Sequence, residues 1–253
     1  MILKHFTYEF SAQLDFSTPV TEQYVVLRCL PYPDDVQQMH SGSVTVEPWC
    51  PICYATDGFG NTLMSGSFYL PHSRFSYLET ARVTIDLSRR KRKTPHPMYR
   101  HPGLLTRPDE ALISFSASIP SRDPERLAAA VTEHFSYVPG STGVQTTAAE
   151  SFARGTGVCQ DYAQVLAVLC RLKGLPARYC MGITEGTGVT HAWTEIHWNG
   201  TWLGVDPTRN CLADERYLRF AIGRDAQDCP VERGSFLGQT DQTQTVYAVM
   251  TQE

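Results

Sequence analysis

The chain has 253 residues, enough for one large domain or two modest ones, and 42% of them are hydrophobic, which is enough to fill a core. The formal net charge of −4 gives no reason to expect nucleic acid as a partner, and no stretch approaches the roughly 20 apolar residues that span a bilayer. Eight cysteines occur, but the start of the chain has no apolar run of signal-peptide length, so we expect a cytoplasmic protein with mostly reduced thiols.

The first third of the sequence has the pattern of an antiparallel β structure. Strand-like runs occur at residues 23–30, 43–47 and 81–85. Between the last two, an Asp57-Gly58 step is typical of a tight turn between strands. Short strands separated by turns that contain proline and glycine favour an antiparallel sheet or a small sandwich. We therefore expect residues 1–87 to form an N-terminal antiparallel β domain.

A basic stretch that contains prolines, SRRKRKTPHP at 88–97, follows the β region. Clustered positive charge and proline favour an exposed, extended segment, so we predict that residues 88–120 are a linker. A basic run of this kind is also compatible with binding to nucleic acid or to an anionic surface. Because the chain is acidic overall and the run has no interleaved aromatic residues, a solvated linker is the favoured interpretation.

The sequence after this stretch predicts helices and then strands. Asp123, followed by proline, predicts a capped helix that runs to about Phe135. A longer helix begins near Cys159 and ends at 173–176, and its apolar positions cover most of its circumference, as in a buried central helix. Further patterns predict a short helix at 147–153 and strands at 177–183, 190–197, 202–206 and 245–250. Residues 121–253 are therefore expected to form an α+β domain in which helices pack on an antiparallel sheet.

Cys159 lies where the central helix is expected to start. A free thiol is mostly protonated at neutral pH, whereas the thiolate is the nucleophile, and the N–H groups and partial positive charge of a helix start favour a thiolate. Gly155 and Gly157 allow the backbone to turn sharply and a substrate carbonyl to approach closely. The backbone N–H of Cys159 is then a natural donor to a developing oxyanion.

His191 and Asp206 fall on two strands that a hairpin is expected to join. The Asn-Gly step at 199–200 is typical of a two-residue turn, and counting back from it places Trp193 opposite Asp206. His191 and Asp206 are then diagonal neighbours on one face, with Cβ atoms on the order of 7 Å apart. A carboxylate there accepts a hydrogen bond from the imidazole, fixes its tautomer and stabilises the imidazolium. A slip of one residue in this register would place the two side chains on opposite faces.

Each of these three residues also has an ordinary structural interpretation. Cys159 suits a buried small side chain, His191 a hydrogen-bonded sheet histidine, and Asp206 a turn former. A chain order and a register that bring all three together favour a catalytic triad over three separate coincidences.

Three other features have weaker chemical interpretations. Cys50 and Cys53 would be half of a zinc site, but no second pair with similar spacing occurs, so the sequence predicts no metal site. Asp161 is expected to stabilise the N-terminus of the central helix. Arg224 and Asp225 are expected to form a structural ion pair away from the site.

The chain resembles the transglutaminase-like superfamily in several segments. Four of them are GVCQDYA at 157–163, LPARY at 175–179, HAW at 191–193 and DPT at 206–208. KHFTY at 4–8 and DGFGN at 57–61 are similar to the β domain that precedes the catalytic domain in the bacterial branch, whose members are often described as candidate cysteine proteases. The resemblance implies a papain-like core preceded by an antiparallel β-sandwich-like domain.

The resemblance also implies roles for individual residues. Cys159 would be the nucleophile, His191 the general base and then acid, and Asp206 the residue that orients the imidazole. Tyr137 and Trp193 are weaker candidates for oxyanion or substrate contacts, with packing as the alternative. No cofactor and no metal are implied. Members of the superfamily hydrolyse amides or transfer the acyl group to an amine through the same thioester, so the resemblance leaves the reaction open.

The leading hypothesis is a cysteine-dependent hydrolase of peptide or protein amides. The alternative within the same class is acyl transfer to an amine, and the alternative of another class is a non-catalytic peptide-binding or scaffold protein. The expected partner is a peptide or protein amide, with no nucleic acid and no membrane. The sequence leaves open the oligomeric state and the role of the β domain.

Overall fold

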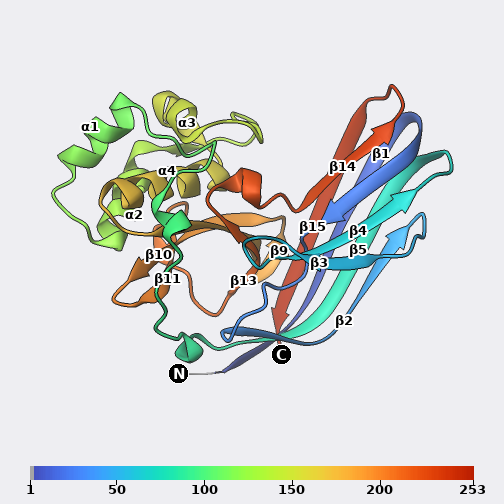
Figure 1. Ribbon diagram of the computed structural model, residues 1–253, viewed down its shortest axis with the longest axis horizontal. Helices are drawn as coiled ribbons and strands as arrows, with labels where there is room; N and C mark the ends of the chain where they lie inside the picture. The colour runs from blue at the N-terminus through green and yellow to red at the C-terminus, as the bar shows by residue number, and fades with distance from the viewer. Residues whose placement is uncertain (1–2) are drawn as a thin grey trace.

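One long strand, β1 (Lys4–Leu27), organises the N-terminal part of the computed structural model, which describes residues 3–253 (Figure 1). Buried and less buried side chains alternate along its first half, as expected for a strand with one face against a core. That first half pairs with β5 (His72–Ile85) and β15 (Gln242–Gln252), and the second half pairs with β4 (Thr62–Phe68) and β14 (Glu232–Leu237). A single strand thus serves two layers of sheet.

The two layers enclose an apolar core, so the predicted antiparallel β region is confirmed. β2 (Gln37–Glu47) extends the first layer beyond β5, and β3 (Cys53–Thr56) extends the second beyond β4. Fully buried side chains from both layers form the core, among them Phe6, Phe10, Val25, Met64 and Phe75. The predicted turn between β3 and β4 is also present: Gly60 has a φ of 87°, and the Asp57 carboxylate accepts hydrogen bonds from the backbone of Phe59 and Asn61.

Helices pack on a second antiparallel sheet in the other part of the molecule (Figure 1). The helices are α1 (Glu110–Ser118), α2 (Pro124–His134), α3 (Ala148–Arg154) and α4 (Cys159–Leu172). The sheet has the order β12 (Cys211–Leu212), β11 (Thr201–Asp206), β10 (His191–Trp198), β8 (Ala177–Thr184) and β13 (Tyr217–Gly223). α4 contacts β10 and β8 and is buried from Asp161 to Cys170, as predicted for a central helix. The expected α+β fold is confirmed.

The helix ends follow from local sequence. The Asp123 carboxylate accepts hydrogen bonds from the backbone of Glu125 and Arg126, and Thr147 and Glu150 form a capping box. The remaining short elements are η1 (Leu87–Arg89), η2 (Pro97–Arg100), η3 (Ala226–Asp228), and a parallel pair of strands, β6 (Ser136–Tyr137) and β7 (Thr156–Gly157).

Two segments differ from the boundaries expected from the sequence. Residues 88–120 include α1, which is capped by Asp109 and buries Leu112 against the other helices. The last strands, β14 and β15, return to β1 instead of joining the sheet of the α+β region, because β5 and β4 each pair with only one edge of β1 and leave the backbone groups of the other edge unpaired. The N-terminal part therefore contains both ends of the chain.

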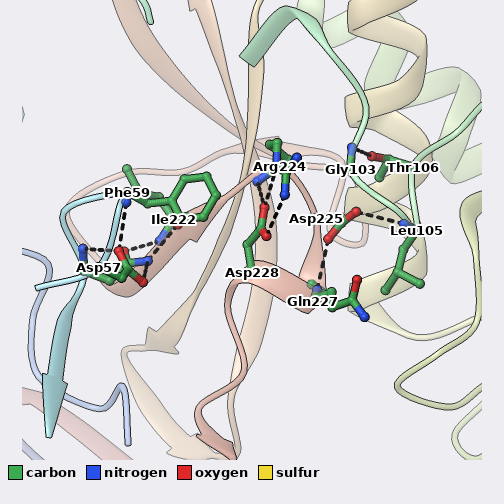
Figure 2. Close-up of polar contacts among 12 residues, drawn as sticks. Asp57, Phe59, Gly103, Leu105, Thr106, Ile222, Arg224, Asp225, Gln227 and Asp228 are labelled. Atoms are coloured by element: carbon green, nitrogen blue, oxygen red, sulfur yellow. Dashed lines mark hydrogen bonds and ion pairs between the residues drawn. The ribbon is translucent and has the colours of Figure 1, made fainter. Parts of the chain in front are cut away.

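Several contacts connect the two parts. β9 (Gly186–Gly188), in the loop before His191, pairs with β15. Figure 2 shows the end of β13 and the segment that follows it. The Asn61 side chain hydrogen-bonds both backbone groups of Ile222, on β13, at 2.8 and 2.9 Å. In the same region Arg224 pairs with Asp228 at 2.9 Å, not with Asp225 as expected. Asp225 instead accepts a hydrogen bond from the Leu105 backbone, because the loop before α1 lies against it.

Candidate active site

Cys159 is the first residue of α4 and is partly exposed. Asp161, in the same turn, is fully buried, and its carboxylate accepts hydrogen bonds from the Val158 backbone at 2.8 Å and the Thr142 hydroxyl at 2.6 Å. Burial raises the pKa of Asp161. Asp161 therefore fixes the helix start that carries Cys159, as its position in the sequence indicates.

The two glycines before Cys159 have separate structural reasons. Gly155 ends α3 in the left-handed conformation with a φ of 63°. A Cβ on Gly157 would lie 2.7 Å from the Cβ of Asp161, which is closer than real side chains approach. Gly157 thus leaves room for the capping carboxylate, a reason that differs from the substrate approach inferred from the sequence.

His191 begins β10 and Asp206 ends β11, and the register between these strands is the predicted one. Trp198 pairs with Thr201 and Thr194 with Val205, and Asn199 and Gly200 both have positive φ at the hairpin tip. The distance between His191 Nε2 and Asp206 Oδ2 is 2.7 Å. The side chain of His191 is 11% exposed and that of Asp206 is fully buried. The two residues therefore meet as the hairpin geometry predicts.

Four hydrogen bonds hold the Asp206 carboxylate. Its Oδ1 accepts from the backbone N–H of Thr208 at 2.9 Å and of Arg209 at 3.3 Å, and its Oδ2 accepts from His191 and, at 2.8 Å, from the Tyr217 hydroxyl. Burial alone would raise the pKa of Asp206, but these hydrogen bonds and the attraction to His191 hold it below its usual value. Asp206 is therefore ionised at neutral pH.

The titration of His191 depends on both of its partners. Burial of the ring would lower its pKa, but the hydrogen bond to Asp206 and the nearby Asp206 and Cys159 groups raise it to about 9. His191 is thus a cation at neutral pH that binds a carboxylate and lies within the electrostatic influence of Cys159. Such an arrangement can move a proton between a sulfur nucleophile and a leaving group.

Tyr137 and Trp193 lie in different surroundings. Tyr137, on β6, is 52% exposed, and burial and the nearby Cys159 raise its pKa. Trp193 is 1% exposed, and its ring packs beside His191 with a centroid distance of 6.3 Å. Of these two weaker candidates, only Tyr137 is placed where a substrate bound at Cys159 could reach it.

Two residues near Asp206 were missed by the sequence reasoning. Tyr217, at the start of β13, donates to Asp206 from a strand that no pattern had predicted. Arg209 lies three residues after Asp206, with its Nε 3.8 Å from Oδ2 and its side chain 48% exposed. The DPTR sequence could have drawn attention to Arg209, whereas nothing local points to Tyr217.

The remaining cysteines and other potential metal ligands bear on metal binding, and the helices bear on membrane insertion. Cys50 is buried, Cys53 is exposed, and all eight cysteines are free. Within residues 3–253, no three His, Cys, Asp or Glu side chains are grouped as metal ligands would be. Nor does any helix in this part of the chain combine the length and apolarity that crossing a membrane requires.

Comparison with known families assigns both parts of the chain. The model of the transglutaminase-like superfamily matches residues 114–207, which include Cys159, His191 and Asp206. The model of the bacterial transglutaminase-like N-terminal region matches residues 6–84. The chain therefore has a transglutaminase-like core preceded by a bacterial transglutaminase-like N-terminal region.

Individual relatives differ in their length and in their sequence identity to this chain. A Mycobacterium tuberculosis protein is 35% identical over 125 residues, which cover 43% of this chain and 40% of the relative's length. A protein-glutamine gamma-glutamyltransferase of Pseudomonas aeruginosa is 27% identical over 57% of this chain and 24% of its own. The structure of a candidate cysteine protease from Cytophaga hutchinsonii superposes with a TM-score of 0.80 at 20% identity, covering 99% of this chain and 91% of that one. This last likeness shows a shared fold.

Proposed function

We propose that this protein is a cysteine-dependent hydrolase of peptide or protein amides. The observation that carries the proposal is the position of His191, which is hydrogen-bonded to Asp206 and lies close enough to Cys159, at the start of α4, for that residue to raise its pKa. In this proposal Cys159 is the nucleophile, His191 the acid and base, and Asp206 the group that orients His191.

The reaction proceeds in two halves. The Cys159 sulfur attacks the amide carbonyl, and the oxyanion accepts a hydrogen bond from the Cys159 backbone N–H, which has no partner within the helix because it lies in the first turn. His191 gives its proton to the departing amine, leaving a thioester on Cys159. Water then attacks the thioester, with His191 taking its proton, and the carboxylic acid leaves as the sulfur is freed.

Hydrolysis is favoured over transfer to an amine because the site is open to water. Cys159 is partly exposed, and Tyr137 beside it is half exposed, so a thioester there would not be sheltered from solvent. An amine that binds near Cys159 would compete with water for the same thioester. Incubation with a peptide amide and a labelled primary amine separates the two reactions: hydrolysis yields the free acid, and transfer yields the labelled amide.

The nucleophile is tested by brief iodoacetamide labelling at pH 6, read by mass spectrometry. We expect Cys159 to react far faster than the other seven cysteines, and we expect His191→Ala to remove this preference. His197→Ala is the matched control because His197 lies on the same strand and bonds only the Lys93 carbonyl. Equal labelling of Cys159 and its neighbours in the wild-type protein would contradict the proposal and favour a non-catalytic binding protein.

Two further parts of the proposal concern organisation and location. We place the division between a β domain and a catalytic domain in residues 88–120, supported by two family models of which one ends at residue 84 and the other begins at residue 114. We place the enzyme in the cytoplasm, supported by eight cysteines that all remain free, as expected in a reducing compartment.

A further inference from the structure

A cavity of about 250 Å³ lies between the two parts of the molecule. One wall is the segment 32–37, which connects β1 to β2, and a second is the basic stretch at 89–93. The floor consists of side chains from β8, β10, β11 and β13, including Arg178, Glu195 and Arg219. The cavity thus uses the basic stretch, which the proposed reaction leaves without a role.

The charges around this cavity are unequal. Six cationic and four anionic side chains line it, an excess of two positive charges. The pairing is well defined at the floor, where Glu195 lies between Arg178 and Arg219 with N–O distances of 2.5 Å to each. At the rim Asp35 pairs with Lys91 at 2.8 Å. Ion pairs among the lining residues therefore leave an excess of two positive charges around the cavity.

Two more cations of the basic stretch have partners, since Arg89 pairs with Asp86 at 3.3 Å and Lys93 lies 3.8 Å from Asp35. Arg90 is the lining cation that these pairs leave over. Its side chain is partly buried, and no carboxylate lies within 4.0 Å of its guanidinium in the part of the chain that the structure describes. Burial also lowers the pKa of Arg90. A guanidinium that borders a half-enclosed space without a carboxylate partner has free donors for an anion from solution.

Aromatic rings complete the walls. Trp202 borders the cavity, and the Arg178 guanidinium lies 4.3 Å from its ring centroid. Tyr32 borders it from the β part.

We infer that this cavity is a binding site for a small molecule that carries a phosphate group. A phosphate monoester has a charge close to −2 at pH 7, which matches the excess, and the arginine fork matches its oxygens.

The cavity shares two side chains with the candidate active site. Trp193 lines the cavity and packs beside His191. Tyr217 lines it as well, and its hydroxyl donates to Asp206 Oδ2 at 2.8 Å. A bound phosphate compound therefore changes the surroundings of His191 and Asp206, and with them the reactivity of Cys159. This second part rests on the proposed function, whereas binding itself does not.

Binding is tested by titrating the protein with inorganic phosphate and with phenyl phosphate at low ionic strength. Calorimetry measures the affinity, and fluorescence reports the site because two of the four tryptophans, Trp193 and Trp202, border it. We expect saturable binding that Arg90→Ala weakens at least tenfold. Arg92→Ala is the matched control, since Arg92 belongs to the same basic run but does not border the cavity.

Several results would overturn the inference. Binding that does not saturate, or that Arg92→Ala weakens as much as Arg90→Ala, would indicate only general attraction to a basic surface. Citrate that binds as tightly as phosphate would indicate a carboxylate site instead. Unfolding by urea verifies that Arg90→Ala folds, and Arg90→Lys, which keeps the charge, is expected to retain part of the affinity.

The effect on the active site has its own readout. Saturating phenyl phosphate is expected to change the rate of Cys159 alkylation at pH 6 by at least threefold in the wild-type protein, and not in Arg90→Ala. Binding without any change in this rate would refute the effect on Cys159, whereas the proposed phosphate-binding site would still stand. Cys159→Ala is expected to bind phosphate normally, so a failure of the proposed catalytic role would not be confused with a failure of the site.

Discussion

The β part and the α+β part each bury a carboxylate, and the pKa values of these two carboxylates are shifted in opposite directions. Glu79, on β5, is fully buried, and burial raises its pKa to about 8. It accepts a hydrogen bond from Tyr8, but its Oε2 has no partner among residues 3–253. Asp206, on β11, is equally buried, yet its pKa is held below the usual value.

The difference lies in what surrounds each group. Burial is the largest influence on both carboxylates, and in both cases it favours the neutral form. Around Asp206 the protein supplies four hydrogen-bond donors, one of which is the His191 cation, and together they reverse the effect. Glu195 shows the same reversal more strongly, because Arg178 and Arg219 lower its pKa to about 2. The sheet of the α+β part thus keeps the buried carboxylates of Asp206 and Glu195 charged, whereas the β core holds Glu79 neutral at neutral pH.

The largest expected effect is that of removing the charge beside His191. Asp206→Asn should reduce turnover of a peptide amide roughly 10,000-fold, because an amide cannot stabilise the imidazolium. Its cost in unfolding free energy should be smaller, about 1–3 kcal/mol for the altered hydrogen bonds. Steady-state kinetics and urea unfolding measure the two quantities. Equal losses, on a common free-energy scale, would mean that Asp206 has a structural role. Asp214→Asn, at an exposed ion pair, is the control and should change neither.

The second effect concerns the stability of the sheet in the α+β part, where Glu195 lies between two arginines. Glu195→Gln leaves the guanidinium groups of Arg178 and Arg219 without the carboxylate between them, so the unfolding free energy should fall by about 3–5 kcal/mol. Arg219 retains Asp34, which favours the lower end of this range. Urea unfolding measures the change. A loss below about 1 kcal/mol would mean that these buried charges are not coupled as their distances indicate.

The third effect concerns Glu79, whose pKa is shifted in the opposite direction to that of Asp206. Glu79 is neutral in the folded protein up to about pH 8 but ionises in the unfolded chain above its ordinary value of 4.5. Stability is therefore fullest below pH 4.5 and falls as pH rises toward 8, by about 4–5 kcal/mol. Glu79→Gln should flatten this slope, measured by urea unfolding at several pH values. Glu232, with a pKa raised to about 7 by burial, should leave a residual slope of the same sign. An unchanged slope would show that Glu79 is ionised in the folded protein.

The sequence predicted the parts of this molecule that depend on local signals. The Asp123 cap, the start of α4 at Cys159 and the Asn199-Gly200 turn each need only neighbouring residues, and the turn determines the register that joins His191 to Asp206. These signals were sufficient to anticipate that contact. Local signals of this kind predict structure well because caps and tight turns involve groups only a few residues apart.

The elements that were missed depend on distant contacts. α1 buries only Leu112 and Ser116, so its sequence lacks a continuous apolar face, and packing against other helices stabilises it. β13 contains Arg219, which is buried only because Glu195 and Asp34 lie beside it. The return of β15 to β1 joins residues more than 200 positions apart, and no local pattern could indicate it. Sequence reasoning therefore located the histidine and its carboxylate but not the hydroxyl from β13 that supports them.

The smallest effect tests that hydroxyl. Tyr217→Phe removes one of four hydrogen bonds to Asp206 while the ring still packs against Trp193. Turnover should fall about tenfold, with at most about 1 kcal/mol lost in unfolding free energy. The acid limb of the pH profile should also move upward, because a carboxylate with one donor fewer is protonated at higher pH. Tyr99→Phe, at another buried tyrosine, should change neither turnover nor the limb. A merely structural Tyr217 would lower stability and leave the pH profile in place, whereas a positioning role requires the limb to move while the protein stays folded.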